Sequence, residues 1–191
     1  MLSLRFEYAT DGSSIEELLD LSFGVNRHAK VSYRYRDGVE ALPELGFVAE
    51  FEHRLVGAIR YWPMLLDDMP VLLLGPLAIH PDHKNTGIGR ALVTRSLGAA
   101  AERGDDHVFL VGEHAYYRRF GFMIAPPAII MPGERPERLH WLGLRGVTEP
   151  PAGGTLRSWG CLRRSAAAPR TLALTRPVMS EASATAPVWA S

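Results

Sequence analysis

The sequence predicts an α/β (α+β) protein. Residues 71–79 form an apolar run that is typical of a buried strand, and apolar residues return at helical spacing from residue 87 to about residue 103. Two further apolar runs, residues 47–51 and 55–62, lie on either side of a polar turn and predict a hairpin. These three observations indicate a fold in which strands and a long helix succeed one another within one domain.

The remaining elements are shorter and are predicted from the same periodicities. Upstream of the hairpin we expect a strand, a helix and a second, less regular helix, at residues 4–8, 13–23 and 26–45. Gly104 is placed to end the long helix. Downstream of it we expect a strand, a short helix and two further strands, at residues 107–111, 116–120, 127–131 and 138–144.

Length and charge narrow the functional classes. The chain has 191 residues, which is enough for one domain with a sizeable core. Its 21 Lys and Arg residues balance 21 Asp and Glu residues, so we expect no nucleic acid and no membrane as partner. No apolar stretch is long enough to span a bilayer, and the N-terminus lacks the apolar core of a signal peptide. The single cysteine, Cys161, excludes an internal disulfide and a cysteine-rich metal site. We therefore expect a cytoplasmic protein that uses no metal.

The composition changes near Thr148, which predicts a domain at residues 1–147 and a C-terminal extension at residues 148–191. The extension is rich in Pro, Ala and Arg and has no acidic residue between Pro150 and Ser180. This composition favours a poorly packed, solvated tail. The alternative is an arm that docks on a second subunit, as in a homodimer, or that guards the active site.

The most informative segment is the loop between the buried strand and the long helix. The strand ends at Ile79, a polar loop follows, and Gly87 and Gly89 open the helix. The free N–H groups of a helix's first turn, together with the helix dipole, favour an anion at this position. Glycine lets the ligand approach the backbone closely, because it has no Cβ. The segment therefore predicts a site for a phosphorylated ligand.

Two common phosphate-binding loops do not fit these residues. A P-loop requires a lysine directly after its second glycine, and no lysine follows either Gly87 or Gly89. A dinucleotide-binding fingerprint requires glycine or alanine at the position of Leu92. The segment instead resembles the acyl-CoA loop of the GNAT superfamily of N-acetyltransferases, in which V/I-x-P ends a strand and Q/R-x-x-G-x-G/A begins a helix. This chain has Ile79-His80-Pro81 and then Lys84-Asn85-Thr86-Gly87-Ile88-Gly89.

One position departs from the acyl-CoA loop pattern, whereas a second motif supports the resemblance to the family. Lys84 stands where the family usually has Gln or Arg, so the positive charge is kept but the planar fork of arginine is lost. GNAT enzymes commonly carry a tyrosine four residues before a Gly-Phe pair, and here Tyr117 precedes Gly121-Phe122. Both motifs occur in the expected order, and the resemblance covers roughly residues 4–135. On these motifs the chain is identified as a member of the GNAT superfamily.

The resemblance implies a GNAT acyl-CoA N-acyltransferase fold, with a mixed, mainly antiparallel sheet and helices on both faces. It also implies acetyl-CoA as cosubstrate. Gly75-Pro76 interrupts the strand at 71–79 and indicates a bulge. In GNAT folds this strand splays from the next one, and the acyl-CoA arm bonds to its exposed backbone. The implied CoA-binding residues are Leu77, Ala78 and Ile79 on the strand, and Lys84, Asn85, Thr86, Gly87, Ile88, Gly89 and Arg90 at the loop.

The resemblance assigns the catalytic acid to Tyr117. Acetyl transfer expels a thiolate, whose thiol has a pKa of about 8.5, and a tyrosine with a pKa of about 10 can protonate it. Tyr116 better fits a residue that packs the short helix. The amine must also lose a proton to attack, and Glu113 is the candidate general base, with His114 and His80 at comparable strand ends. Many such enzymes need only a chain of water molecules for that step.

A basic and aromatic segment lies between the first two predicted helices. Arg27, Arg34 and Arg36 are interleaved with Tyr33 and Tyr35. Such a segment can form a substrate wall or a nucleic-acid patch. We interpret it as a solvated helix face, and the balanced charge argues against nucleic acid.

We therefore expect an N-acetyltransferase that transfers an acetyl group from acetyl-CoA to a primary amine by direct attack on the thioester. The acceptor is expected to be a small-molecule amine or a protein lysine. The alternative is a non-catalytic acyl-CoA-binding module with a protein partner. Turnover of acetyl-CoA in the presence of an amine panel distinguishes the two.

Overall fold

The computed structural model describes residues 1–160. Its nine strands are β1 (Leu2–Phe6), β2 (Phe47–Phe51), β3 (Arg54–Leu66), β4 (Met69–Ile79), β5 (His107–Val111), β6 (Met123–Ile124), β7 (Ile129–Ile130), β8 (Leu139–Gly143) and β9 (Gly154–Ser158). Its α-helices are α1 (Gly12–Phe23), α2 (Val31–Arg34), α3 (Ile88–Arg103) and α4 (His114–Tyr117). Short 3-10 turns lie at Ala9–Asp11, Val25–Ala29, Pro43–Leu45, Pro81–His83, Arg118–Phe120 and Pro136–Arg138.

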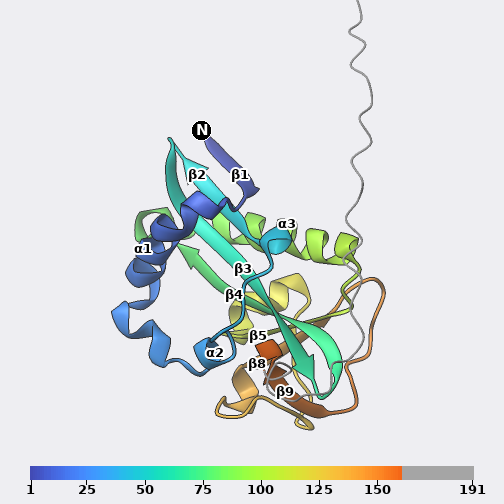
Figure 1. The fold of residues 1–191 in the computed structure, drawn as a ribbon. Coiled ribbons are helices and arrows are strands. Elements are labelled where there is room, and N and C mark those ends of the chain that lie inside the picture. The colour runs from blue at the N-terminus through green and yellow to red at the C-terminus, as the bar shows by residue number, and fades with distance from the viewer. Residues whose placement is uncertain (161–191) are drawn as a thin grey trace, which may run out of the picture.

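The strands form one sheet in the order β1-β2-β3-β4-β5-β8-β6, of which Figure 1 labels all but β6. Neighbours along this path are antiparallel except β4 and β5, which are parallel because α3 carries the chain back between them. The strand β9 pairs antiparallel with the end of β3 and parallel with β7. The expected mixed, mainly antiparallel sheet is therefore confirmed.

The helices α1 and α3 cover opposite faces of this sheet (Figure 1). Successive residues of a strand point to opposite faces. In β3, Ala58 packs with Ile15 and Leu18 of α1, whereas the next residue, Ile59, belongs to the core formed with α3. The expected placement of helices on both faces is thus also confirmed.

The long helix α3 begins and ends close to the expected residues. It follows Gly87 and ends at Gly104, whose φ of 101° suits glycine. The Gly104 N–H donates to the carbonyl oxygens of Ala100 and Ala101, at 3.2 and 3.1 Å. These bonds satisfy carbonyl groups that the last helical turn leaves free.

Two expected helices differ from the structure in length or position. The second helix expected within residues 26–45 is present as α2, but it has only four residues and lies between short 3-10 turns. Gly38 adopts a φ of 67° and Pro43 follows it, and both residues interrupt helical geometry. The short helix expected at 116–120 begins earlier, at His114, and its last part is a 3-10 turn.

The domain boundary expected at residue 147 is too early. The strand β9 pairs with Met64, Leu65 and Leu66 of β3, and Leu156 is 1% exposed. This pairing joins segments far apart in the chain, so the local composition of residues 148–160 could not reveal it. The folded domain extends at least through Ser158, while residues 161–191 lie outside the described residues.

Candidate active site

The loop between β4 and α3 presents an exposed backbone. Asn85 and Gly87 have φ angles of 64° and 89°, which turn the chain just ahead of the helix. The hydroxyl of Thr86 donates to the carbonyl oxygen of His83 at 2.6 Å and closes the turn. Residues 84–87 are all exposed. The loop is thus shaped by local hydrogen bonding and leaves its outer surface to solvent.

The N-terminus of α3 has free backbone donors. Ala91 is the first residue whose N–H bonds within the helix, to the carbonyl oxygen of Gly87 at 3.0 Å. The N–H groups of Ile88, Gly89 and Arg90 therefore point out of the helix end, where the dipole adds partial positive charge. A Cβ added to Gly87 would meet no atom within 4 Å, so the space beside it is open. These donors fit a pyrophosphate, to which Lys84 and Arg90 would add positive charge.

Ile88 can contact a ligand only through its backbone. Its side chain is 2% exposed and lies in the core below α3. A Cβ on Gly57 would approach Ile88 Cγ2 to 2.9 Å, so β3 and α3 are tightly packed at this point. Packing of this side chain anchors the phosphate loop to the sheet.

The parallel strands β4 and β5 are paired only at one end. Leu72 pairs with Val108 and Leu73 with Phe109, and no further pairs join the two strands although both continue. A strand without a neighbour presents unpaired N–H and C=O groups. The edge of β4 beyond Leu73 is therefore available to an extended ligand that reaches it from the N-terminus of α3.

The Gly75-Pro76 pair lies where the two strands separate. The register between β3 and β4 shifts between Ile59 and Tyr61, opposite this pair. Proline has no N–H to donate and glycine has no side chain to pack, which suits an interruption of the ladder. The bulge expected from these two residues is confirmed.

The three β4 residues assigned to the acyl-CoA arm have different surroundings. Leu77 and Ile79 are partly buried against the core on the α3 side, whereas Ala78 is 1% exposed and packs on the α1 side. Their side chains therefore serve packing on both faces of the sheet. Ala78 can therefore contact a ligand only through its backbone, and the carbonyl oxygen of Ile79 already accepts a hydrogen bond from the Ser22 hydroxyl at 3.2 Å.

Tyr117 lies at the end of β5. A Cβ on Gly112 would approach Tyr117 Cε2 to 2.5 Å, so the tyrosine ring covers this glycine. The ring meets that of Phe122 edge to face, with centroids 5.9 Å apart. Burial raises the pKa of Tyr117 well above its ordinary value. The neighbouring Tyr116 raises it further, whereas the charge of Arg36 lowers it. The hydroxyl therefore keeps its proton at neutral pH.

Tyr116 lies at the phosphate loop. Its hydroxyl is 2.5 Å from the position that a Cβ would take on Gly89. Burial raises the pKa of Tyr116 as well. The sequence predicted that Tyr116 packs the short helix. Its position beside the first turn of α3 was not predictable from the motif.

Comparison with known proteins assigns the family. The model of the Acetyltransferase (GNAT) family matches residues 13–122. The chain belongs to the GNAT family. The matched range contains the loop between β4 and α3, the separated strands and the segment from Tyr117 to Phe122.

Two relatives and one crystal structure agree with this family. YhbS of Escherichia coli (strain K12), named an uncharacterized N-acetyltransferase, is 30% identical over 125 residues, which cover 64% of this chain and 74% of YhbS. YjhQ of the same strain bears the same description and is 29% identical over 117 residues, which cover 59% of this chain and only 65% of YjhQ. The crystal structure of Escherichia coli YhbS in complex with CoA has a TM-score of 0.68 at 26% identity, and covers 86% of this chain and 93% of that one. The expected family and fold class are thus confirmed, and the relatives' names agree with the expected enzyme class, an acyltransferase.

The candidate general base of this GNAT protein is a surface residue. The side chain of Glu113 is 82% exposed and lies 3.8 Å from the guanidinium of Arg138. The next residue, His114, stacks on His140 with ring centroids 5.3 Å apart. At the end of β4, His80 accepts a hydrogen bond on Nδ1 from the Asp82 N–H at 3.3 Å. A role for Glu113 in proton transfer stays a prediction.

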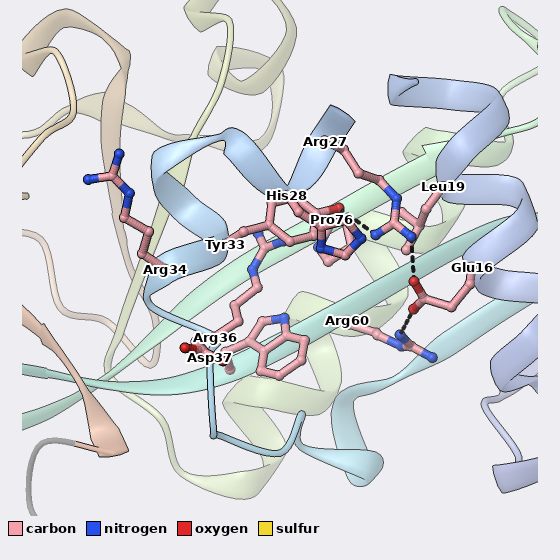
Figure 2. A pocket seen from close by; sticks show the side chains of 11 residues that line it. Glu16, Leu19, Arg27, His28, Tyr33, Arg34, Arg36, Asp37, Arg60 and Pro76 are labelled. Carbon is pink, nitrogen blue, oxygen red and sulfur yellow. Dashed lines mark hydrogen bonds and ion pairs between the residues drawn. The ribbon is translucent and has the colours of Figure 1, made fainter. Parts of the chain in front are cut away.

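The interpretation of residues 27–36 as a solvated helix face is wrong. Arg27 is 3% exposed, Tyr35 is 8% exposed, and Arg36 reaches into a cavity beside Pro76 (Figure 2). Trp62 of β3 lines the same cavity. The alternation of arginine and tyrosine was visible in the sequence. The burial of these side chains, and the position of Trp62 of β3 beside them, were not.

Within residues 1–160, no group of three or more His, Cys, Asp or Glu side chains is placed to hold a metal ion. No helix in this part of the chain has the length and apolar character needed to cross a membrane.

Proposed function

We propose that this protein is an N-acetyltransferase that transfers an acetyl group from acetyl-CoA to a primary amine by direct attack. One observation carries the proposal: the unpaired edge of β4 lies next to the N-terminus of α3. A single extended ligand would place its pyrophosphate on the loop and its acyl arm along β4. The crystal structure of YhbS, a relative with this fold, in complex with CoA supports the choice of ligand.

The reaction follows from the chemistry of a thioester. The amine nitrogen attacks the carbonyl carbon, the new C–N bond forms, and the C–S bond breaks to release the CoA thiolate. A backbone N–H of β4 would polarise the carbonyl. The Tyr117 hydroxyl would donate its proton to the thiolate and regain one from solvent. The proton lost by the amine passes to Glu113 or to water.

An acceptor screen tests this proposal. The full chain is incubated with acetyl-CoA and a panel of small amines and lysine-containing peptides, and free thiol is measured. Thiol release that requires both acetyl-CoA and an amine would support N-acetyl transfer. If acetyl-CoA binds by calorimetry but no amine induces thiol release, the chain is instead a non-catalytic acyl-CoA-binding module with a protein partner.

A further inference from the structure

A cavity of about 380 Å³ lies between α1, the segment at 27–37 and the strands β3 and β4 (Figure 2). Its wall includes Pro76, which lies where β4 separates from β5. A volume of this size is in the range of small-molecule sites, roughly 300–1,000 Å³. The cavity thus reaches the place where an acyl group on β4 would meet its acceptor.

Four arginines line this wall, and two of the three that are not exposed are paired with carboxylates. Arg27 donates from Nε to Asp20 at 2.7 Å and from Nη2 to Glu16 at 2.5 Å. Arg60 donates to both carboxylate oxygens of Glu7, at 2.8 and 2.6 Å, and also contacts Glu16. Their positive charges are therefore balanced within the protein.

The third arginine, Arg36, has no such balance. Its Nε and Nη1 atoms are buried without a hydrogen-bond partner, and no carboxylate of residues 1–160 forms an ion pair with it. It lies against two aromatic rings, with Cζ 4.7 Å from the ring centroid of Tyr33 and 5.8 Å from that of Trp62. Figure 2 accordingly marks interactions for Arg27 and Arg60 but none for Arg36.

A second unpartnered donor belongs to another residue of this wall. Trp62 Nε1 is buried and has no hydrogen-bond partner within the described part of the chain. Indole N–H and guanidinium N–H groups only donate. A ligand that satisfies Arg36 and Trp62 must therefore supply acceptor atoms, and the charge on Arg36 favours a negative one.

Arg36 also lies close to the reacting strand. Its Nη2 is 3.3 Å from the position of a Cβ on Gly75, so a side chain there would press on the guanidinium. Burial lowers the pKa of Arg36 to about 10. Tyr33 acts in the opposite direction, and the like charges of Arg27 and Arg60 lower the pKa further. The guanidinium still carries its charge at neutral pH and can attract an anion.

We propose that the acceptor is a small amine that carries a carboxylate, which Arg36 and Trp62 bind inside this cavity while the amine faces Pro76. A carboxylate brings one negative charge to match the buried guanidinium of Arg36, whereas a dianionic phosphate would bring a second charge against the Asp37 carboxylate in the same wall. This proposal rests on the proposed function, because it names the class of acceptor for the same reaction.

Matched acceptors test the proposal by turnover. Amino acids with α- or ω-amine groups are compared with their own carboxamides, at saturating acetyl-CoA, by thiol release. Arg36→Gln should lower kcat/KM for the acids by roughly 10- to 150-fold, the range for hydrogen bonds to charged groups, and lower it much less for the carboxamides, whose oxygen is a neutral acceptor. Arg36→Lys should lower it less. Arg157→Gln, a half-exposed arginine of β9, is the control and should change neither.

A binding measurement keeps this test independent of turnover. The melting temperature of the full chain is measured with the corresponding N-acetyl amino acids and with their amides. The acids should raise it in the wild type but not in Arg36→Gln. If no amine is acetylated, the proposed function fails, and this shift still decides the role of Arg36.

Three results would overturn the carboxylate assignment. The first is equal use of acids and carboxamides by the wild type together with equal melting shifts. The second is an Arg36→Gln variant that keeps the wild-type preference for acids. The third is a preference for phosphate-bearing amines that depends on Arg36, which would assign the cavity to a phosphate.

Discussion

The hydroxyl of Tyr116 lies 2.5 Å from the position that a Cβ would occupy on Gly89, the second residue of α3. A Cβ at Gly89 would therefore have to displace the end of the Tyr116 side chain, although Gly89 itself has ordinary helical geometry and no positive φ. The adjacent Tyr117 meets the Tyr116 ring at 86° and packs against the core. Two neighbouring tyrosines of α4 thus contact two different parts of the candidate site.

Gly89→Glu is expected to abolish acetyl-CoA binding without unfolding the chain. The new Cβ would displace the Tyr116 hydroxyl, and the carboxylate would place negative charge at the helix end proposed for the pyrophosphate. Isothermal titration calorimetry measures the binding, and circular dichroism checks the fold. Gly98→Glu is the matched control in the same helix, because Gly98 is exposed and a Cβ there meets nothing within 4 Å. The control should bind normally, and wild-type affinity in Gly89→Glu would contradict the site.

Lys84 is expected to contribute charge to CoA binding. The residue is exposed and precedes the free N–H groups of α3. Lys84→Arg should keep or improve the affinity for acetyl-CoA, since the charge is retained. Lys84→Glu should weaken it, and more so at low salt, where screening is least. Titrations at two salt concentrations measure the effect. Equal affinities for the Glu variant and the wild type at low salt would show that Lys84 does not face the phosphates.

Tyr117→Phe is expected to slow the chemical step and spare binding. The substitution keeps the ring that covers Gly112 and removes only the proton donor. A single acid–base group contributes about 10²–10⁴ in rate, so kcat should fall within that range at unchanged acetyl-CoA affinity. Tyr116→Phe is the control, and its kcat should fall much less. If Tyr117→Phe turns over like the wild type with an acceptor from the screen, the thiolate takes its proton from water.

Lowering the pH from 7 to 5 is expected to destabilise the fold through His107. Burial lowers the pKa of His107, and Trp141 Nε1 donates to its unprotonated Nδ1 at 3.1 Å. The unfolded chain takes up this proton near pH 6.5, so between that pH and the lower folded pKa the unfolded state binds more protons. The free energy of unfolding therefore falls as the pH falls through this window. Burial lowers the pKa of His140 too, which adds a change of the same sign.

Urea denaturation at pH 7, 6 and 5 measures this change. His107→Gln should reduce the dependence of the unfolding free energy on pH, because it removes one of the two histidines. An unfolding free energy that stays constant or rises towards pH 5 in the wild type would contradict the assignment of a neutral, buried His107.

Secondary-structure elements that are specified by residues within one segment were predictable from the sequence. The strand expected at 107–111 agrees with the structure, and the helix expected at 87–103 differs only by beginning one residue later. Both elements were predictable because apolar spacing and flanking glycines lie within a single segment of the chain. The bulge in β4 was predictable for the same reason, since Gly75-Pro76 interrupts a ladder wherever its partner lies. The placement of β9 beside β3 was not, because pairing between distant segments leaves no mark in either segment's composition.

The sequence by itself determined the family and predicted the phosphate loop, because a strand end, a glycine turn and a helix start are consecutive in the chain. Only the tertiary structure decided what surrounds them. Tyr116 reaches Gly89, and Arg36 meets Trp62, through the packing of segments that are far apart in the chain. Whether an arginine is solvated, paired or left without a partner depends on which groups the fold brings within hydrogen-bonding distance, and this is a property of the packed molecule.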